Sequence, residues 1–210
     1  MIFRFDKIPS TQDVLKDFYK SGEATFGDVA IAWSQKNGRG RYGKSFHSPG
    51  GRGIYLSVLL HYINPERLTV RAAAAVLRAI EQVTGAVAQV EWVNDVLIGG
   101  KKISGILAEA ISGDDGKPGA VVLGVGLNVA EPESGFPKDI QSRAGALLSA
   151  AEVAAMPAEA FEEMRSNLTD ALIEQLLAID APDGASQDIE LYRSRIINTC
   201  DMPADALESL

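Results

Sequence analysis

The first 130 residues alternate between short apolar runs and short polar segments rich in glycine. Apolar runs of about four to eight residues bounded by turn residues are typical of buried β-strands. Strands are therefore predicted over residues 2–5, 29–33, 53–60, 87–92, 103–111 and 120–129. The Gly99-Gly100 pair between apolar residues predicts a hairpin turn, and residues 113–116 predict another turn.

Helix signals follow a different spacing. Ser10 is a typical N-cap residue and Gly22 a typical C-terminal stop, which predicts a helix between them. Asn64-Pro65 opens an alanine-rich helix that extends to about residue 83. Residues 141–197 have a helical pattern, interrupted at Pro157 and again around residues 182–184. A strand-rich half followed by a helical half predicts an α+β fold with a mixed or antiparallel sheet flanked by helices.

Composition narrows the class of protein. A hydrophobic content of 46% with 23% charged residues is ordinary for a globular protein of 210 residues, and the apolar runs are too short to span a bilayer. No signal peptide is visible at the N-terminus. The single cysteine, Cys200, fits a reducing compartment, so a cytoplasmic location is expected. With only two histidines beside it, a zinc site is not expected.

The charge distribution is uneven. The chain has a net charge of -8, yet residues 36–52 carry five cations and no acid, and Lys101-Lys102 forms a second basic pair. The acidic balance argues against general binding of DNA or RNA. A local cationic site on an acidic body instead favours a small anionic ligand.

The densest cationic segment is residues 38–44, Gly-Arg-Gly-Arg-Tyr-Gly-Lys. Glycine lets the backbone approach a ligand closely, and arginine offers a planar donor fork for carboxylates and phosphates. Taken alone, the segment is equally compatible with a solvated hairpin tip or an arginine loop that binds RNA.

Further segments occur with this loop in a fixed order, and together they resemble the catalytic domain of biotin protein ligases, the biotin–[acetyl-CoA-carboxylase] ligases. The resemblance covers residues 8–130 and is vaguer up to residue 197. The segments are Ser10-Thr11-Gln12, Gln35, the loop 38–44, Ser48-Pro49-Gly50-Gly51-Arg52-Gly53-Ile54-Tyr55-Leu56-Ser57, Trp92-Val93-Asn94-Asp95, Lys102-Ile103-Ser104-Gly105-Ile106-Leu107-Ala108-Glu109 and Gly124-Val125-Gly126-Leu127-Asn128-Val129.

The resemblance implies a two-step reaction and three residues that carry its charge. Biotin's carboxylate attacks the α-phosphorus of ATP to give biotinyl-5′-AMP, and a lysine of a carrier domain then attacks the adenylate. Like charges 4 Å apart repel by about 4 kcal/mol near a protein surface, so cations must offset the approach of two anions. By resemblance, Arg39, Arg41 and Lys102 supply that charge together with Mg²⁺.

Other positions are assigned by the same resemblance. Ser10, Thr11 and Gln35 match residues that hydrogen-bond biotin's ureido ring, although Ser10 also suits simple helix capping. Asp95 is the expected neighbour of Mg²⁺, and an Asx turn is the alternative for Asn94 and Asp95. Phe46 matches a residue that stacks on adenine, with a core position as its alternative. The remaining expected binding positions are Gly38, Asn94, Gly105, Ile106 and Asn128.

Some positions depart from the family pattern. Glu91 stands where the family usually has lysine, Val93 stands where it has proline, and Tyr42 stands at an arginine position. Residues 1–198 are expected to form the catalytic domain and residues 199–210 a tail, with neither the N-terminal winged helix nor the usual C-terminal SH3-like barrel.

The expected function is therefore activation of biotin with ATP and transfer to a biotin carboxyl carrier protein. A homodimer is compatible with the sequence, and neither DNA nor a membrane is expected as a partner. One alternative is a lipoate or octanoyl ligase or transferase of the same superfamily. Another is a non-catalytic biotin-binding homologue, which Glu91 and the expected absence of the barrel would favour.

Overall fold

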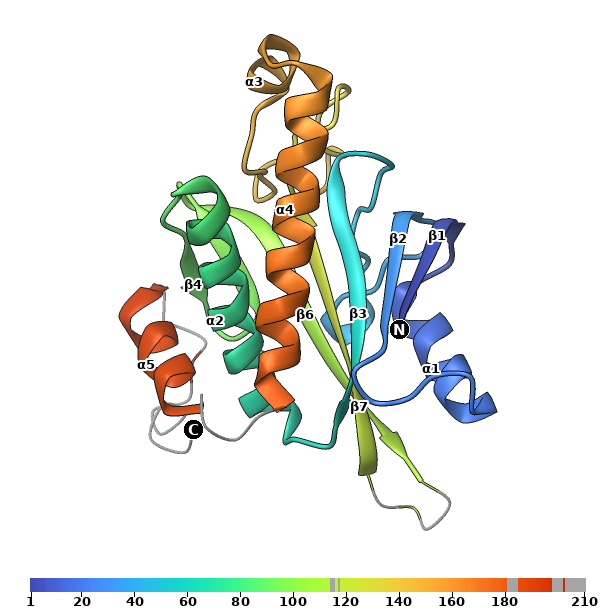
Figure 1. The fold of residues 1–210 in the computed structure, drawn as a ribbon. Coiled ribbons are helices and arrows are strands. Elements are labelled where there is room, and N and C mark those ends of the chain that lie inside the picture. Colours follow the sequence, from blue (N-terminus) through green and yellow to red (C-terminus); the bar gives the residue numbers. More distant parts are fainter. Residues whose placement is uncertain (114–115, 117, 181–184, 198–201, 203–210) are drawn as a thin grey trace.

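The computed structural model describes residues 1–113, 116, 118–180, 185–197 and 202. Eight strands, five α-helices and two short 3₁₀ segments occur in these residues (Figure 1). The strands are β1 (Ile2–Ile8), β2 (Val29–Gln35), β3 (Gly53–His61), β4 (Gln89–Glu91), β5 (Asp95–Ile98), β6 (Lys101–Ser112), β7 (Pro118–Asn128) and β8 (Ile196–Ile197). The helical segments are α1 (Thr11–Ser21), η1 (Arg41–Gly43), α2 (Pro65–Thr84), α3 (Ala150–Ala155), α4 (Ala158–Leu177), η2 (Ala178–Asp180) and α5 (Ala185–Arg195).

All eight strands belong to one mixed sheet in the order β1-β2-β3-β7-β6-β5-β4-β8. The two outer pairs, β1 with β2 and β4 with β8, are parallel, and the inner pairs are antiparallel. A short turn at Gly99 and Gly100, where both residues have positive φ, joins β5 to β6, whereas the loop 36–52 joins β2 to β3. The α+β prediction with a mixed sheet is confirmed.

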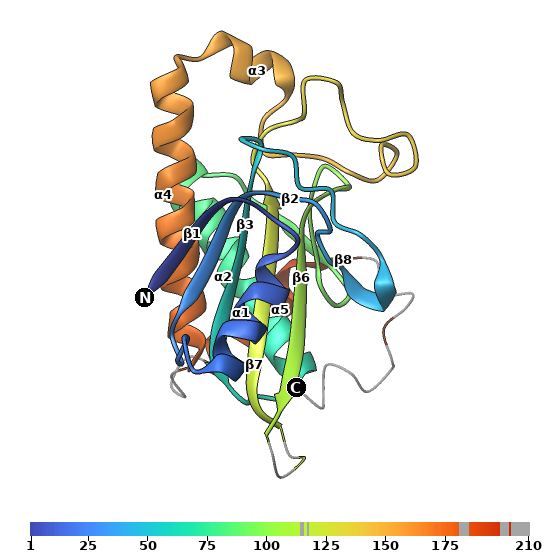
Figure 2. The same ribbon diagram turned by 90° about the vertical axis from the view of Figure 1, so that its right-hand side faces the viewer.

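Helices cover the two faces of the sheet unequally. In Figures 1 and 2, α2, α4 and α5 lie on one face, whereas α1 lies on the other. Successive side chains of a strand point to opposite faces of the sheet. The side chains of β7 therefore pack alternately against the helices of the two faces. Val121, Leu123 and Val125 pack into the large core under α2 and α4, and Ala120 and Val122 pack into a smaller cluster under α1.

The helix ends match the sequence signals. The Ser10 hydroxyl accepts a hydrogen bond from the backbone N–H of Gln12, and Gly22 ends α1 in the left-handed conformation with φ 79°. Asn64 caps α2 in the same way with Pro65 in its first turn. Pro157 precedes α4, which confirms the predicted interruption. Ser149 and Glu152 form a reciprocal capping box at the start of α3.

The prediction of helix over residues 141–197 was wrong at both ends. Residues 141–149 are not helical: they run beside the sheet, with single bridges from Ala144 to Lys102 and from Leu148 to Ala130. Residues 196 and 197 form β8 rather than helix, because they pair with β4. The predicted strand 2–5 extends to residue 8. The turn at 113–116, the break at 182–184 and the domain boundary at 198 fall wholly or partly outside the described residues.

Helix α5 is held against α2 by a buried charge cluster. The Asp188 carboxylate accepts hydrogen bonds from Arg71 Nε at 2.8 Å and Arg78 Nη1 at 2.5 Å, and the Asp188 side chain is only 7% exposed. Arg71 also donates to the carbonyl of Ile179. A buried carboxylate needs such partners because desolvation of an unpaired charge is costly. Across the described residues, every helix is too short or too polar to cross a lipid bilayer.

Candidate functional site

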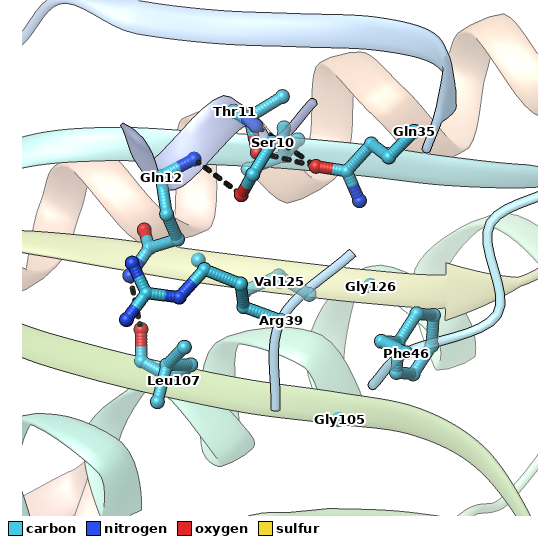
Figure 3. Close-up of a pocket in the computed structure, with 12 residues that line it drawn as sticks. Ser10, Thr11, Gln12, Gln35, Arg39, Phe46, Gly105, Leu107, Val125 and Gly126 are labelled. Atoms are coloured by element: carbon cyan, nitrogen blue, oxygen red, sulfur yellow. Dashed lines mark hydrogen bonds between the residues drawn. The ribbon is translucent and has the colours of Figure 1, made fainter. Parts of the chain in front are cut away.

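A patch of the sheet without side chains lies beside α1. Gly105 on β6 and Gly126 on β7 are register partners, and Gly124 lies two residues along on the same face. A Cβ at Gly126 would stand 2.5 Å from the Phe46 ring, and a Cβ at Gly124 would stand 2.9 Å from Gln12 Oε1. The three glycines therefore form the floor of a pocket that side chains from α1 and residues 38–46 enter from above (Figure 3).

One end of this pocket holds a network of neutral polar groups. Gln35 Oε1 accepts hydrogen bonds from the Thr11 backbone N–H at 2.8 Å and the Thr11 hydroxyl at 3.2 Å, and Gln35 Nε2 donates to Ser48 Oγ at 3.0 Å. The hydroxyls of Thr11 and Ser57 are 2.8 Å apart. Such a set of donors and acceptors suits an uncharged polar ligand group in a mostly apolar pocket.

Gln12 closes the pocket on the β6 side. Its amide nitrogen donates to Glu109 Oε2 at 2.9 Å and to the carbonyls of Leu107 and Val122 at 3.3 Å. Its Oε1 atom is buried and has no hydrogen-bond partner. A buried acceptor left unpaired is unfavourable, so a donor on a bound ligand would stabilise this position.

Arg39 lies at the other end of the pocket and contacts two carboxylates. It donates to Asp13 Oδ1 at 2.5 Å and to Glu109 Oε1 at 2.6 Å, and Glu109 also pairs with Lys16 at 2.9 Å. Burial lowers the pKa of Arg39, but the Asp13 hydrogen bond and the charges of Glu109 and Asp13 outweigh it and raise the pKa above its ordinary value. Arg39 thus stays cationic while both acids compete for its guanidinium.

The loop that carries Arg39 and Arg41 is a tight hairpin. The Gly40 N–H donates to the Lys44 carbonyl, and Tyr42 adopts the left-handed region with φ 57° while its ring is exposed. Gly38 permits the close approach at the base of the loop, since a Cβ there would lie 2.3 Å from the Phe46 carbonyl oxygen. Arg41 Nη1 reaches Asn94 Oδ1 at 3.4 Å, so the loop extends across to the β4–β5 turn.

The β4–β5 turn brings the predicted nucleotide-side residues together. Lys102 Nζ lies 2.6 Å from Asp95 Oδ1, and Asn94 Nδ2 donates to the Ile106 carbonyl at 3.2 Å. Asn128 Nδ2 donates to the Gly145 carbonyl, which places it at the end of β7 on the same side. Tyr192 on α5 supports the turn from behind by donating to the Val93 carbonyl at 3.2 Å.

Residues for a metal are few. Among the described residues, no group of three or more His, Cys, Asp or Glu side chains could hold a metal ion. Asp95 provides one carboxylate beside the cationic groups. A single carboxylate is compatible with Mg²⁺ that arrives with a nucleotide, because Mg²⁺ bound in this way takes most of its ligands from phosphates and water.

A family model for the biotin/lipoate A/B protein ligase family matches residues 4–128, which is more than half of the chain. The chain belongs to this family. Among relatives, the bifunctional ligase/repressor BirA of Bacillus subtilis is 35% identical over 150 residues, covering 70% of this chain and 46% of that protein. A biotin–[acetyl-CoA-carboxylase] ligase of Mycobacterium tuberculosis is 37% identical over 136 residues, covering 61% and 47%.

Solved structures of this family agree with the fold. The biotin protein ligase of Aquifex aeolicus in complex with biotin and ATP superposes with a TM-score of 0.72 at 26% identity, over 93% of this chain and 78% of that one. A Leishmania major biotin protein ligase with biotinyl-5-AMP gives 0.68 at 20% identity, which supports the fold alone. The chain spans about half the length of the curated relatives it matches.

The structure places the predicted site residues around this pocket and the adjoining β4–β5 turn, except that the Ile106 side chain packs into the large core on the opposite face of the sheet. It also adds residues to which the resemblance assigned no role. Asp13 and Glu109 hold Arg39, and Ser48 and Ser57 complete the polar network. The sequence does contain a signal for Ser57, because a polar residue inside an apolar strand indicates a hydrogen-bonding role. The sequence contains no signal for the pairing of Glu109 with Arg39, because 70 residues separate them and no local pattern links them.

Proposed function

We propose that this chain activates biotin with ATP to form biotinyl-5′-AMP and transfers the biotinyl group to a lysine of a carrier domain. The observation that carries the proposal is the polarity of one pocket. Neutral donors and acceptors around Gln35 lie at one end and Arg39 lies at the other, while Arg41 and Lys102 lie next to the pocket at the β4–β5 turn. Biotin has the same division, with an uncharged ureido ring and a carboxylate.

The first step joins two anions, which is why the cationic end matters. An oxygen of the biotin carboxylate forms a bond to the α-phosphorus, the bond from that phosphorus to the bridging oxygen breaks, and pyrophosphate leaves. No proton needs to move, because the carboxylate is already ionised at neutral pH. Arg39, Arg41 and Lys102 would offset the repulsion and stabilise the charge on the phosphoryl oxygens.

Arg39 must exchange partners for this role. In the structure it is bound to Asp13 and Glu109, whose side chains are 43% and 22% exposed. Ion pairs that water can reach contribute about 0.2–1 kcal/mol to stability. A ligand carboxylate can therefore replace Asp13 and Glu109 as the partner of Arg39 at low cost in free energy. Lys102 would likewise turn from Asp95 toward the ligand, and this change would leave Asp95 available to Mg²⁺ on the nucleotide.

Adenine would lie against Phe46. The ring rests on the floor made by Gly105 and Gly126: a Cβ at Gly126 would lie 2.5 Å from the ring, which excludes it, and a Cβ at Gly105 would lie 3.3 Å from the ring. Asn94, which donates to the backbone carbonyl of Ile106, lies at the adjoining β4–β5 turn, and Asn128 lies at the end of β7. In the second step the amine of a carrier lysine attacks the carbonyl of the adenylate, the amide forms, and AMP leaves with a proton released to solvent.

Exchange of labelled pyrophosphate into ATP tests the first step, because it requires reversible formation of the adenylate. We expect exchange that depends on biotin and Mg²⁺ and that is not supported by octanoate or lipoate. The polar network favours biotin, since a straight acyl chain has no groups to pair with Thr11 and Gln35. Exchange driven by octanoate or lipoate would assign the chain to the other branch of the family, and biotin binding without exchange would make it a binding protein.

A further inference from the structure

Glu91 is a carboxylate on the same face of the sheet as the candidate site. It is the register partner of Asp95, which in turn pairs with Gly105 and, through it, with Gly126. Register partners point to the same face, and neighbouring strands are about 4.8 Å apart, so Glu91 lies roughly 10 Å from the pocket floor. A bare carboxylate there would repel the phosphate chain of a nucleotide bound beside Asp95.

Arg143 counters that charge from the segment between β7 and α3. Its Nη2 atom donates to Glu91 Oε2 at 3.2 Å, while its side chain remains 69% exposed. The backbone of the same residue is fixed to the site, because the Arg143 carbonyl accepts a 2.7 Å hydrogen bond from the Lys102 N–H. Lys102 and Arg143 are therefore neighbours, and their side chains contact Asp95 and Glu91 respectively.

We propose that Glu91 holds Arg143 in place to bind the β- and γ-phosphates of ATP, so that Arg143 is a binding residue of the nucleotide site. The inference rests on the proposed function, and it names a residue that the sequence motifs do not contain. Lys102 sits at the pocket and meets the α-phosphate region, and a nucleotide whose phosphate chain continues outward along β5 and β4 passes next to Arg143.

The guanidinium of Arg143 has enough donors to bind a phosphate while it is paired with Glu91. A guanidinium has five N–H donors in a fixed fork, and the bond to Glu91 uses one edge of it. The remaining donors can face a phosphate while the carboxylate keeps the fork oriented. The AMP moiety ends before this position, so Arg143 should distinguish a triphosphate from a monophosphate.

The test compares two nucleotides by calorimetry in the presence of biotin. One is α,β-methylene-ATP, which keeps three phosphates but cannot release pyrophosphate, and the other is AMP. We expect Arg143→Ala to lower the affinity for α,β-methylene-ATP about tenfold, which is typical of the loss of a hydrogen bond to a charged group. The affinity for AMP should not change. Arg143→Lys should restore part of the loss, because it keeps the charge but not the fork.

Lys138→Ala is the matched control, since Lys138 is an exposed cation of the same segment. It should change the affinity for neither nucleotide. Equal affinities of wild type and Arg143→Ala for α,β-methylene-ATP, or equal losses for both nucleotides, would overturn the inference while leaving biotin activation intact. Failure of the wild type to bind α,β-methylene-ATP would overturn both the inference and the proposed function.

Discussion

At the scale of single residues, the site depends on glycines, which have no side chain, as much as on its polar and charged residues. Gly105, Gly124 and Gly126 leave a floor on which Phe46 and Gln12 rest. The cations above it are already engaged, because Arg39 binds Asp13 and Glu109 and Lys102 binds Asp95. Under the proposed function, ligand binding in this pocket would therefore exchange carboxylate partners, with the ligand's anion replacing those of the protein.

Gly38→Ala tests the close approach that shapes the loop. A Cβ at this position would lie 2.3 Å from the Phe46 carbonyl and 2.6 Å from Ser48 Oγ, so the loop must shift. We expect biotin affinity measured by calorimetry to fall at least tenfold, because the Gln35–Ser48 contact and Arg39 both move with the loop. The melting temperature should change little, since residues 39–47 are half-buried or exposed.

Gly119→Ala is the control for that change, because a Cβ there meets no atom within 4 Å and its φ is not positive. It should leave biotin affinity and melting temperature unchanged. Wild-type affinity in Gly38→Ala would contradict the account of the loop.

At the scale of elements, α5 supports the β4–β5 turn, which is the proposed nucleotide side of the site. Its Asp188 is fixed by Arg71 and Arg78 on α2, and its Tyr192 donates to the Val93 carbonyl next to Asn94. Burial raises the pKa of the Tyr192 hydroxyl well above its ordinary value, with the Arg41 charge acting weakly in the other direction. Tyr192 therefore remains a neutral donor throughout the physiological range.

Asp188→Asn should destabilise the protein by about 3–5 kcal/mol, because it leaves two arginines, one of them buried, without their shared carboxylate. Chemical denaturation followed by circular dichroism measures this loss. Glu162→Gln removes one acid from an exposed pair within α4 and should cost no more than about 0.5 kcal/mol. A loss as small in Asp188→Asn as in Glu162→Gln would show that the α2–α5 cluster contributes little to stability.

At the scale of the whole molecule, local patterns predicted most of the sheet. Alternation and turn glycines located β2, β3, β6 and β7, and cap residues located α1 and α2, because these signals act within a few residues. Residues 141–149 were predicted wrongly for the opposite reason. Their backbone pairs with Lys102 and Val129, and no local pattern encodes a bond to a distant strand. For the same reason, the sequence did not predict the pairing of Arg143 with Glu91 or of Arg39 with Asp13 and Glu109, because these partners are far apart in the chain.

The most direct test of the account is to incubate the purified chain with biotin, ATP and Mg²⁺ and to identify the small molecules that it retains. We expect biotinyl-5′-AMP in the protein-bound fraction by mass spectrometry, with pyrophosphate released in equal amount. Bound biotin with intact ATP after long incubation would contradict it.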